Sequence, residues 1–290
     1  MSVTVRLAYT AVYEYEDVVL VNDNEVKVFP REESWQQPLD RRLETEPPGR
    51  VLYYRDRYGN PTARVTIKVP HRVAVFRAES TARLLREYRL EPSGDLEIPL
   101  SLQGEPEAAL FLLPSRLVEP SRLEWLAREI LGGERSLRRA LVALTDWVYR
   151  EIKYERGYTN VETKAHEVVE IGRGVCQDKA HLLIGLLRSI GVPARYVSGA
   201  LTDTPGETHA WVEAYWPGEG WVPIDPTHNR VFNLKYYYVK FAHGRDYKDV
   251  PLINGYYISR ASGRIREVKV VPEILQGREL LEGNKGDSGP

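Results

Sequence analysis

The stretch that decides the fold is Gly172-Arg173-Gly174-Val175-Cys176-Gln177-Asp178-Lys179-Ala180-His181-Leu182. Small residues lead into Cys176, and the apolar residues after it recur at the spacing of an amphipathic helix. The sequence therefore predicts that a helix begins at Cys176 and ends before Gly191 and Pro193. The free backbone N–H groups at such a helix end stabilise a thiolate, and they can also donate to an oxyanion.

Cys176 is the only cysteine among 290 residues. One thiol permits no intramolecular disulfide and no cysteine-based zinc site, so Cys176 is either a buried small residue or a working nucleophile. The 40 lysines and arginines nearly balance the 41 acidic residues, which argues against nucleic acid or a membrane surface as partner. No signal-peptide core and no apolar run of about 20 residues is present. We therefore expect a cytoplasmic protein without cofactor or metal that acts on a peptide or protein, and the oligomeric state stays open.

The amino-terminal part of the chain has the pattern of strands. Alternation of apolar and polar residues from Val3 to Tyr15 predicts a half-buried strand. Further strands are expected at residues 26–30, 51–55, 63–69 and 73–76. The Gly59-Asn60 pair predicts a hairpin between two of them. Residues 1–115 are thus expected to form an antiparallel β-sandwich or barrel domain.

Helices then alternate with strands over residues 116–272. Helices are predicted from about residue 122, where Ser121 to Glu124 reads as a capping box, from Ser136 and from Cys176. Strands are expected at residues 194–200, 208–216, 221–225, 255–260 and 265–271. Helices followed by an antiparallel sheet indicate an α+β domain. Residues 273–290 are expected to form a partly flexible tail.

His209 and Asp225 lie on a predicted hairpin. His209 opens an apolar strand, Pro217-Gly218-Glu219-Gly220 reads as the turn, and the returning strand ends at Asp225. A symmetric four-residue loop would place the two side chains on opposite faces of the hairpin. We therefore predict an odd-length loop or a bulge, which allows the carboxylate to hold the imidazole beside Cys176.

Other polar residues fit plainer interpretations. His181 follows Cys176 by five positions on the same helix and points away from it, as a core histidine would. His228 lies three residues after Asp225 but has no further ligand at a suitable spacing, so no metal site is expected. Asp178 suits the first turn of a helix through the helix dipole. The tryptophans 211, 216 and 221 are expected in the core rather than along a substrate channel.

Several ordered motifs together resemble a known family. They are Gly174-Val175-Cys176-Gln177-Asp178, Gly191-Val192-Pro193-Ala194-Arg195-Tyr196, His209-Ala210-Trp211-Val212-Glu213 and Asp225-Pro226-Thr227. They resemble the core of the prokaryotic transglutaminase-like superfamily, whose papain-like members include proposed cysteine proteases. The strands around Tyr58-Gly59-Asn60 resemble the bacterial-type β domain that often precedes that core. Lys179 departs from the family, which usually has an aromatic or apolar residue there.

The resemblance implies a role for each member of a catalytic triad. Cys176 would be the nucleophile, His209 the general acid and base, and Asp225 the residue that orients His209. Three hypotheses stay open: a cysteine peptidase or amidase, an amine acyltransferase (a transglutaminase proper), and a non-catalytic binding module that keeps the fold. An acyl-enzyme is resolved by water in the first and by an amine in the second.

Overall fold

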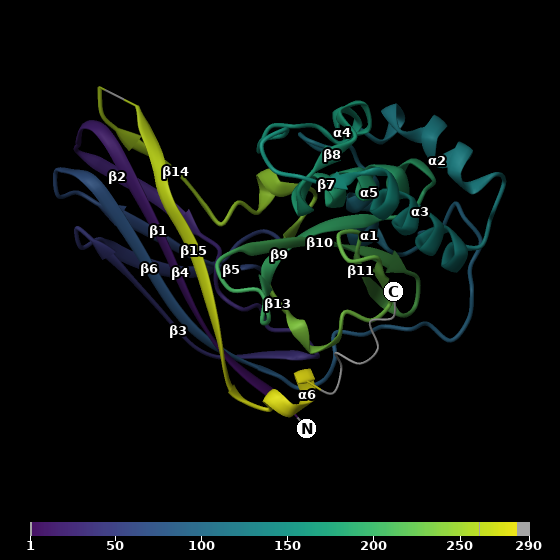
Figure 1. Ribbon diagram of the computed structural model, residues 1–290, viewed down its shortest axis with the longest axis horizontal. Coiled ribbons are helices and arrows are strands. Elements are labelled where there is room, and N and C mark those ends of the chain that lie inside the picture. Colours follow the sequence, from purple (N-terminus) through teal and green to yellow (C-terminus); the bar gives the residue numbers. More distant parts are fainter. Residues whose placement is uncertain (1, 261, 283–290) are drawn as a thin grey trace.

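A computed structural model describes residues 2–260 and 262–282, and Figure 1 shows two sheets of long strands on one side and most of the helices, with a third sheet, on the other. Two four-stranded antiparallel sheets, with strand orders β15-β1-β6-β3 and β14-β2-β5-β4, form the first side. Their strands are β1 (Val3–Val19), β2 (Val21–Val26), β3 (Gln36–Glu46), β4 (Arg50–Arg55), β5 (Pro61–Ile67), β6 (His71–Leu84), β14 (Ile253–Ile258) and β15 (Gly263–Gln276).

The two sheets share one apolar core, as a sandwich does. Val3, Val5 and Leu7 of β1 are buried at alternate positions, because successive side chains of a strand point to opposite faces. They pack in one cluster with residues of the second sheet such as Val65 and Ile67. The expected hairpin is confirmed, since β4 and β5 pair across the turn that contains Gly59. The predicted antiparallel β domain is therefore present.

The last two strands are placed differently from the expectation. We expected residues 255–260 and 265–271 in the sheet of the second domain, and that expectation is wrong. β14 pairs with β2, and β15 pairs with β1 over most of its length. Residues 273–276 continue β15 and Arg278–Glu282 form helix α6, whereas the rest of the expected tail, residues 283–290, lies outside the described residues. The domain limits 1–115 and 116–272 stay predictions.

The second part of the chain is a sheet covered by helices. A five-stranded antiparallel sheet of order β12-β11-β10-β9-β13 forms its centre. The strands are β9 (Ala194–Leu201), β10 (Thr208–Trp216), β11 (Gly220–Asp225), β12 (Arg230–Val231) and β13 (Tyr238–Gly244). The helices are α1 (Pro106–Ala109), α2 (Glu124–Leu131), α3 (Leu137–Glu151), α4 (Ala165–Ile171) and α5 (Cys176–Ser189), and β7 (Lys153–Tyr154) pairs with β8 (Arg173–Gly174).

Alternate residues of β10 serve two different cores. Ala210 and Val212 pack with the helices, whereas Trp211 packs with the sandwich. The central sheet therefore joins both parts of the molecule, and the predicted α+β class with helices on an antiparallel sheet is confirmed.

The helix starts follow the sequence only in part. Ser136 caps α3 by accepting from the N–H of Arg139, and α5 begins at Cys176 as predicted. The capping box at Ser121 is wrong, because a 3-10 turn over Pro120–Arg122 precedes α2. None of the helices in residues 2–260 and 262–282 is long and apolar enough to span a membrane.

Buried polar contacts fix the sandwich against the central sheet. The Asn60 side chain accepts from the N–H of His243 and donates to its carbonyl, both at 2.9 Å. The Gln36 side chain makes the same pair of bonds to the backbone of Lys240, at 2.9 and 2.8 Å. Both amides thus bond backbone groups of β13 that lie in the interior, where polar groups require hydrogen-bond partners.

Candidate active site

Cys176 is the first residue of α5, and the segment before it is held by Asp178. The Asp178 carboxylate accepts from the N–H of Val175 and from the hydroxyl of Thr159, both at 2.7 Å. A Cβ on Gly174 would lie 2.6 Å from this carboxylate, which explains the glycine two residues before the thiol. Burial raises the pKa of Asp178, and its backbone contacts lower it in part. The side chain therefore fixes the helix start that presents the thiol.

His209 and Asp225 come together as the hairpin prediction required. Trp216 pairs with Gly220, so three residues form the loop between the strands. The pairing then continues without a bulge to Val212, which lies opposite Ile224. Continued along the strands, this register places Asp225 on the same face as His209. His209 Nε2 donates to Asp225 Oδ2 at 2.8 Å. The prediction of an odd-length loop is confirmed.

Asp225 receives more donors than the sequence indicated. His228 Nδ1 donates to Asp225 Oδ2 at 2.7 Å, and the Tyr238 hydroxyl donates to the same oxygen at 2.6 Å. The other oxygen accepts from the N–H of Thr227 at 2.7 Å. Asp225 is fully buried, so these donors replace the water that a carboxylate requires.

The charges of His209 and Asp225 depend on each other. Burial of the imidazole lowers its pKa, but attraction and hydrogen bonding to Asp225, with a further hydrogen-bond interaction with Cys176, outweigh burial and raise the pKa of His209 to about 10. Burial raises the pKa of Asp225, and His209 more than reverses this, so the pKa lies well below its ordinary value. Because Nε2 is bonded to Asp225, Nδ1 is the nitrogen left for the thiol. The arrangement favours an imidazolium between a carboxylate and a sulfur.

The raised pKa of His209 predicts how stability depends on pH. The folded protein holds this proton more tightly than the unfolded chain, whose histidine titrates near 6.5. The stabilisation is complete below that pH and is lost as the pH rises through about 10. We expect the unfolding temperature of the wild type to exceed that of His209→Gln by a margin that shrinks by several degrees over this range. Thermal unfolding followed by circular dichroism measures it, and a margin independent of pH would contradict the assignment.

A cavity of about 310 Å³ opens beside the thiol. Cys176 and His209 line it together, with Tyr154, Gln177 and Glu207 around them. Two tyrosines upstream of Cys176, Tyr154 and Tyr158, could donate to an oxyanion. Burial, with Cys176 nearby, raises the pKa of Tyr154, so its hydroxyl keeps its proton. The other, Tyr158, instead lies under Arg173 at 4.4 Å and is absent from the lining.

Two of the three tryptophans of the hairpin, Trp211 and Trp216, are core residues as expected, whereas Trp221 is only partly buried. Trp211 is fully buried and lies nearly parallel to the ring of His209, with centroids 6.1 Å apart. Trp216 is also buried, and Trp221 packs against Phe111 away from the cavity. None of the three lines the space beside Cys176.

His181 and Lys179 lie on the buried side of α5. His181 Nε2 accepts from the N–H of Tyr247 at 3.1 Å, and burial lowers the pKa of His181 to about 4, which agrees with a core role. Lys179 donates to the carbonyls of Val148 and Tyr149 at the end of α3. Cations are favourable at helix carboxyl ends, and burial lowers the pKa of Lys179 to about 8. The lysine at position 179, where the family usually has an aromatic or apolar residue, therefore serves the packing of α5 against α3.

The contact between His228 and Asp225 was not predicted from the sequence. No further ligand stands at a suitable spacing in the sequence, yet the ligand atoms of His209, Asp225 and His228 lie within 4.8 Å of one another in the described structure. Hydrogen bonds to Asp225 account for this grouping. The spacing from Asp225 was a usable signal, since a residue three positions after a strand end can fold back onto it. Tyr238 had no such signal, because β13 reaches Asp225 only through the fold.

Comparisons with known proteins agree with this arrangement. Residues 124–226 match the transglutaminase-like superfamily, and residues 5–83 match the bacterial transglutaminase-like N-terminal region. An uncharacterized protein of Mycobacterium leprae is 30% identical over 93% of this chain and 98% of its own length. An uncharacterized protein of Mycobacterium tuberculosis is 30% identical over 95% of this chain and 94% of its own.

A solved structure covers almost the whole chain as well. It is a proposed cysteine protease from Cytophaga hutchinsonii, 25% identical, with a TM-score of 0.78 over 96% of this chain and 92% of that one. The two family matches fall on the two parts of the chain, and the relatives and the solved structure each cover both parts. The protein therefore belongs to the transglutaminase-like superfamily and carries the bacterial transglutaminase-like amino-terminal region ahead of its core.

Proposed function

We propose that this protein is a thiol-dependent peptidase or amidase that cleaves a peptide-like amide through a thioester at Cys176. The observation that carries the proposal is the order of the three groups: Asp225 holds His209, and His209 interacts with Cys176 at the wall of a cavity. A nucleophile, a base and a residue that orients the base are the parts that acyl chemistry requires.

The proposed reaction has two steps. The Cys176 thiolate attacks the amide carbonyl, the C–S bond forms, and the C–N bond breaks as His209 gives its proton to the leaving amine. Water then attacks the thioester while His209 takes a proton from it, which releases the acid and restores Cys176. The N–H groups at the start of α5 are placed to donate to the oxyanion in both steps.

The cavity supports water as the acceptor more than an amine. Its lining includes polar side chains such as Arg156, Gln177 and Glu207, and none of the tryptophans of the hairpin contributes to it. A site that favours an amine over water needs a dry acceptor path. The described neighbourhood of Cys176 therefore favours hydrolysis, and transfer to a lysine amine is the second candidate. A single thiol that must stay reduced suits the cytoplasm, which we include in the proposal.

The choice between water and amine can be measured directly. We expect the wild type, but not Cys176→Ala, to cut members of a peptide library derived from a digested proteome, as seen by mass spectrometry of new termini. Added monodansylcadaverine should leave hydrolysis products in excess over amine adducts. Predominant amine adducts would favour the acyltransferase, and a Cys176 inert to iodoacetamide in the folded protein would contradict both enzymes and revive the binding module.

A further inference from the structure

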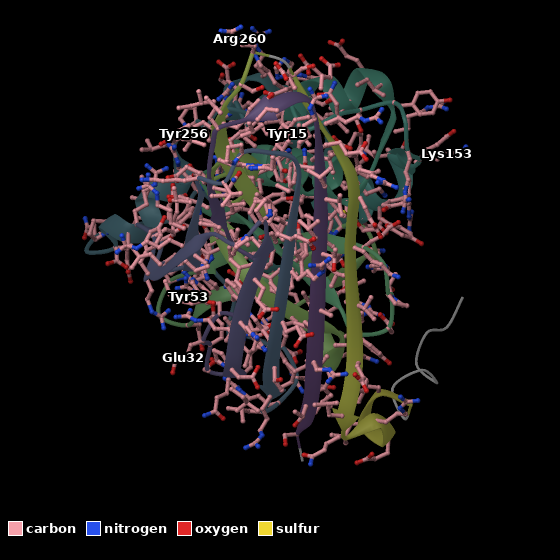
Figure 2. The ribbon with its side chains drawn as sticks, turned by 90° about the vertical axis from the view of Figure 1, so that its left-hand side faces the viewer. Tyr15, Glu32, Tyr53, Lys153, Tyr256 and Arg260 are labelled. Carbon is pink, nitrogen blue, oxygen red and sulfur yellow. The ribbon has the colours of Figure 1, made fainter. Side chains whose placement is uncertain are left out.

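β15 is the outermost strand of its sheet and passes close to the candidate active site. It pairs with β1 on one side, and Figure 2 shows the two strands running side by side along the sheet. β15 also contacts β9 of the central sheet. Val268 of β15 lines the cavity together with Cys176 and His209. An edge strand therefore meets the place where a substrate amide would be attacked.

The backbone N–H and C=O of Val268 point away from β1, toward the edge of the sheet where β15 has no neighbouring strand in the described structure. The N–H of Gly206 donates to the carbonyl of Val270 at 2.6 Å, so the backbone groups of Val270 face away from β1. In an antiparallel pair, residues two apart point their N–H and C=O the same way. Val270 lies opposite Tyr9 and Val268 lies opposite Ala11, with no bulge between them. The N–H and C=O of Val268 therefore face outward, and no described backbone group pairs with them.

We propose that an extended peptide substrate pairs with the edge of β15 at Val268, so that its main chain runs as an added strand past Cys176. The inference rests on the proposed function and narrows its substrate to extended peptide main chain rather than small amides. One substrate residue would exchange both main-chain hydrogen bonds with Val268, as in other cases of strand addition. The exposed side chain of Val268 and that of Leu252 give this path an apolar wall.

The protein itself shows that this edge accepts a backbone partner. Gly206 belongs to the loop before β10 and already occupies the outward carbonyl of Val270. A substrate at Val268 would continue the same row of bonds by one pair. Edge strands with free backbone groups are templates for such pairing.

A proline at position 268 removes the outward N–H and leaves the bonds to β1 in place. Pro272 shows that the strand tolerates this, because it lies opposite Leu7 with the same outward orientation. Ile274, opposite Val5, has that orientation too and does not line the cavity, so Ile274→Pro is a matched control.

The test compares two reagents on Cys176. Iodoacetamide reports the thiol alone, whereas N-acetyl-trialanyl chloromethyl ketone carries a main chain; in the second the sulfur displaces chloride and a C–S bond forms. We expect Val268→Pro to slow the peptide reagent about tenfold, the effect of losing one hydrogen bond, with the iodoacetamide rate unchanged. Ile274→Pro should change neither rate. Intact-mass spectrometry measures both rates.

A second measurement uses the unaltered protein. Methylation of one amide nitrogen of the peptide reagent at a time should slow alkylation about tenfold at a single position. The inference would be overturned, with the proposed function left standing, if methylation slowed alkylation equally at every position. An equal loss of alkylation rate in Val268→Pro and Ile274→Pro would have the same meaning. A wild-type thiol that reacts with neither reagent would overturn the proposed function and this inference with it.

Discussion

Replacing Cys176 with serine lowers the rate of acyl-enzyme formation by about 10⁴-fold or more, the loss seen when the nucleophile of such a triad is removed. The imidazolium of His209 stabilises a thiolate, but it does not ionise a serine hydroxyl at neutral pH. The measurement is the burst of p-nitrophenolate from p-nitrophenyl acetate, with the acetylated protein followed by mass spectrometry.

The change at Cys176 is nearly isosteric, which makes the outcome easy to interpret. The thiol is only partly buried, so we expect an unfolding free energy within about 1 kcal/mol of the wild type. A serine variant that keeps a tenth or more of the burst rate would show that acyl transfer does not pass through Cys176.

Asp225→Asn should lower turnover by about 10⁴-fold, as the loss of the orienting carboxylate does in other triads. Without the negative charge, the pKa of His209 falls, and the buried imidazole loses both its proton and its fixed orientation. Three donors, from His209, His228 and Tyr238, would also face an amide in place of a carboxylate. Breaking a buried charged pair costs about 3 kcal/mol or more, which chemical denaturation can measure.

His228→Gln is the matched control for this change. Glutamine keeps an N–H donor but removes the imidazole, and His228 is one of several donors to Asp225. We expect a loss of less than about tenfold, the scale of one hydrogen bond. Similar losses in Asp225→Asn and His228→Gln would mean that the carboxylate has no special relation to His209.

The parts of the site that the sequence predicted are local ones. The start of α5 follows from small residues ahead of an amphipathic run, and the His209–Asp225 pair follows from one hairpin whose loop length fixes the register. Such features depend on residues close together in the chain. Their geometry can therefore be argued without knowledge of the remaining fold.

The parts that the sequence missed depend on distant segments. β14 and β15 are exposed along most of their length, and nothing in their sequence pattern says which sheet they join. Tyr238 reaches Asp225 only because β13 lies beside β9. Helix α4 is short and buries few residues, Ala165 and Val168 among them, so its apolar period is too brief to read. Long-range pairing, rather than local propensity, decided these cases.

The pairing of β15 with β1 also bears on the order of events during synthesis. β1 leaves the ribosome well before β15, because this neighbour on one side is encoded some 250 residues later. Throughout translation, that side of β1 stays open to other chains, which is the exposure that promotes aggregation of nascent proteins. Closing so long a loop is slow compared with local folding. The emergence of β15, rather than that of the amino-terminal half, thus sets the moment at which this sheet can be completed.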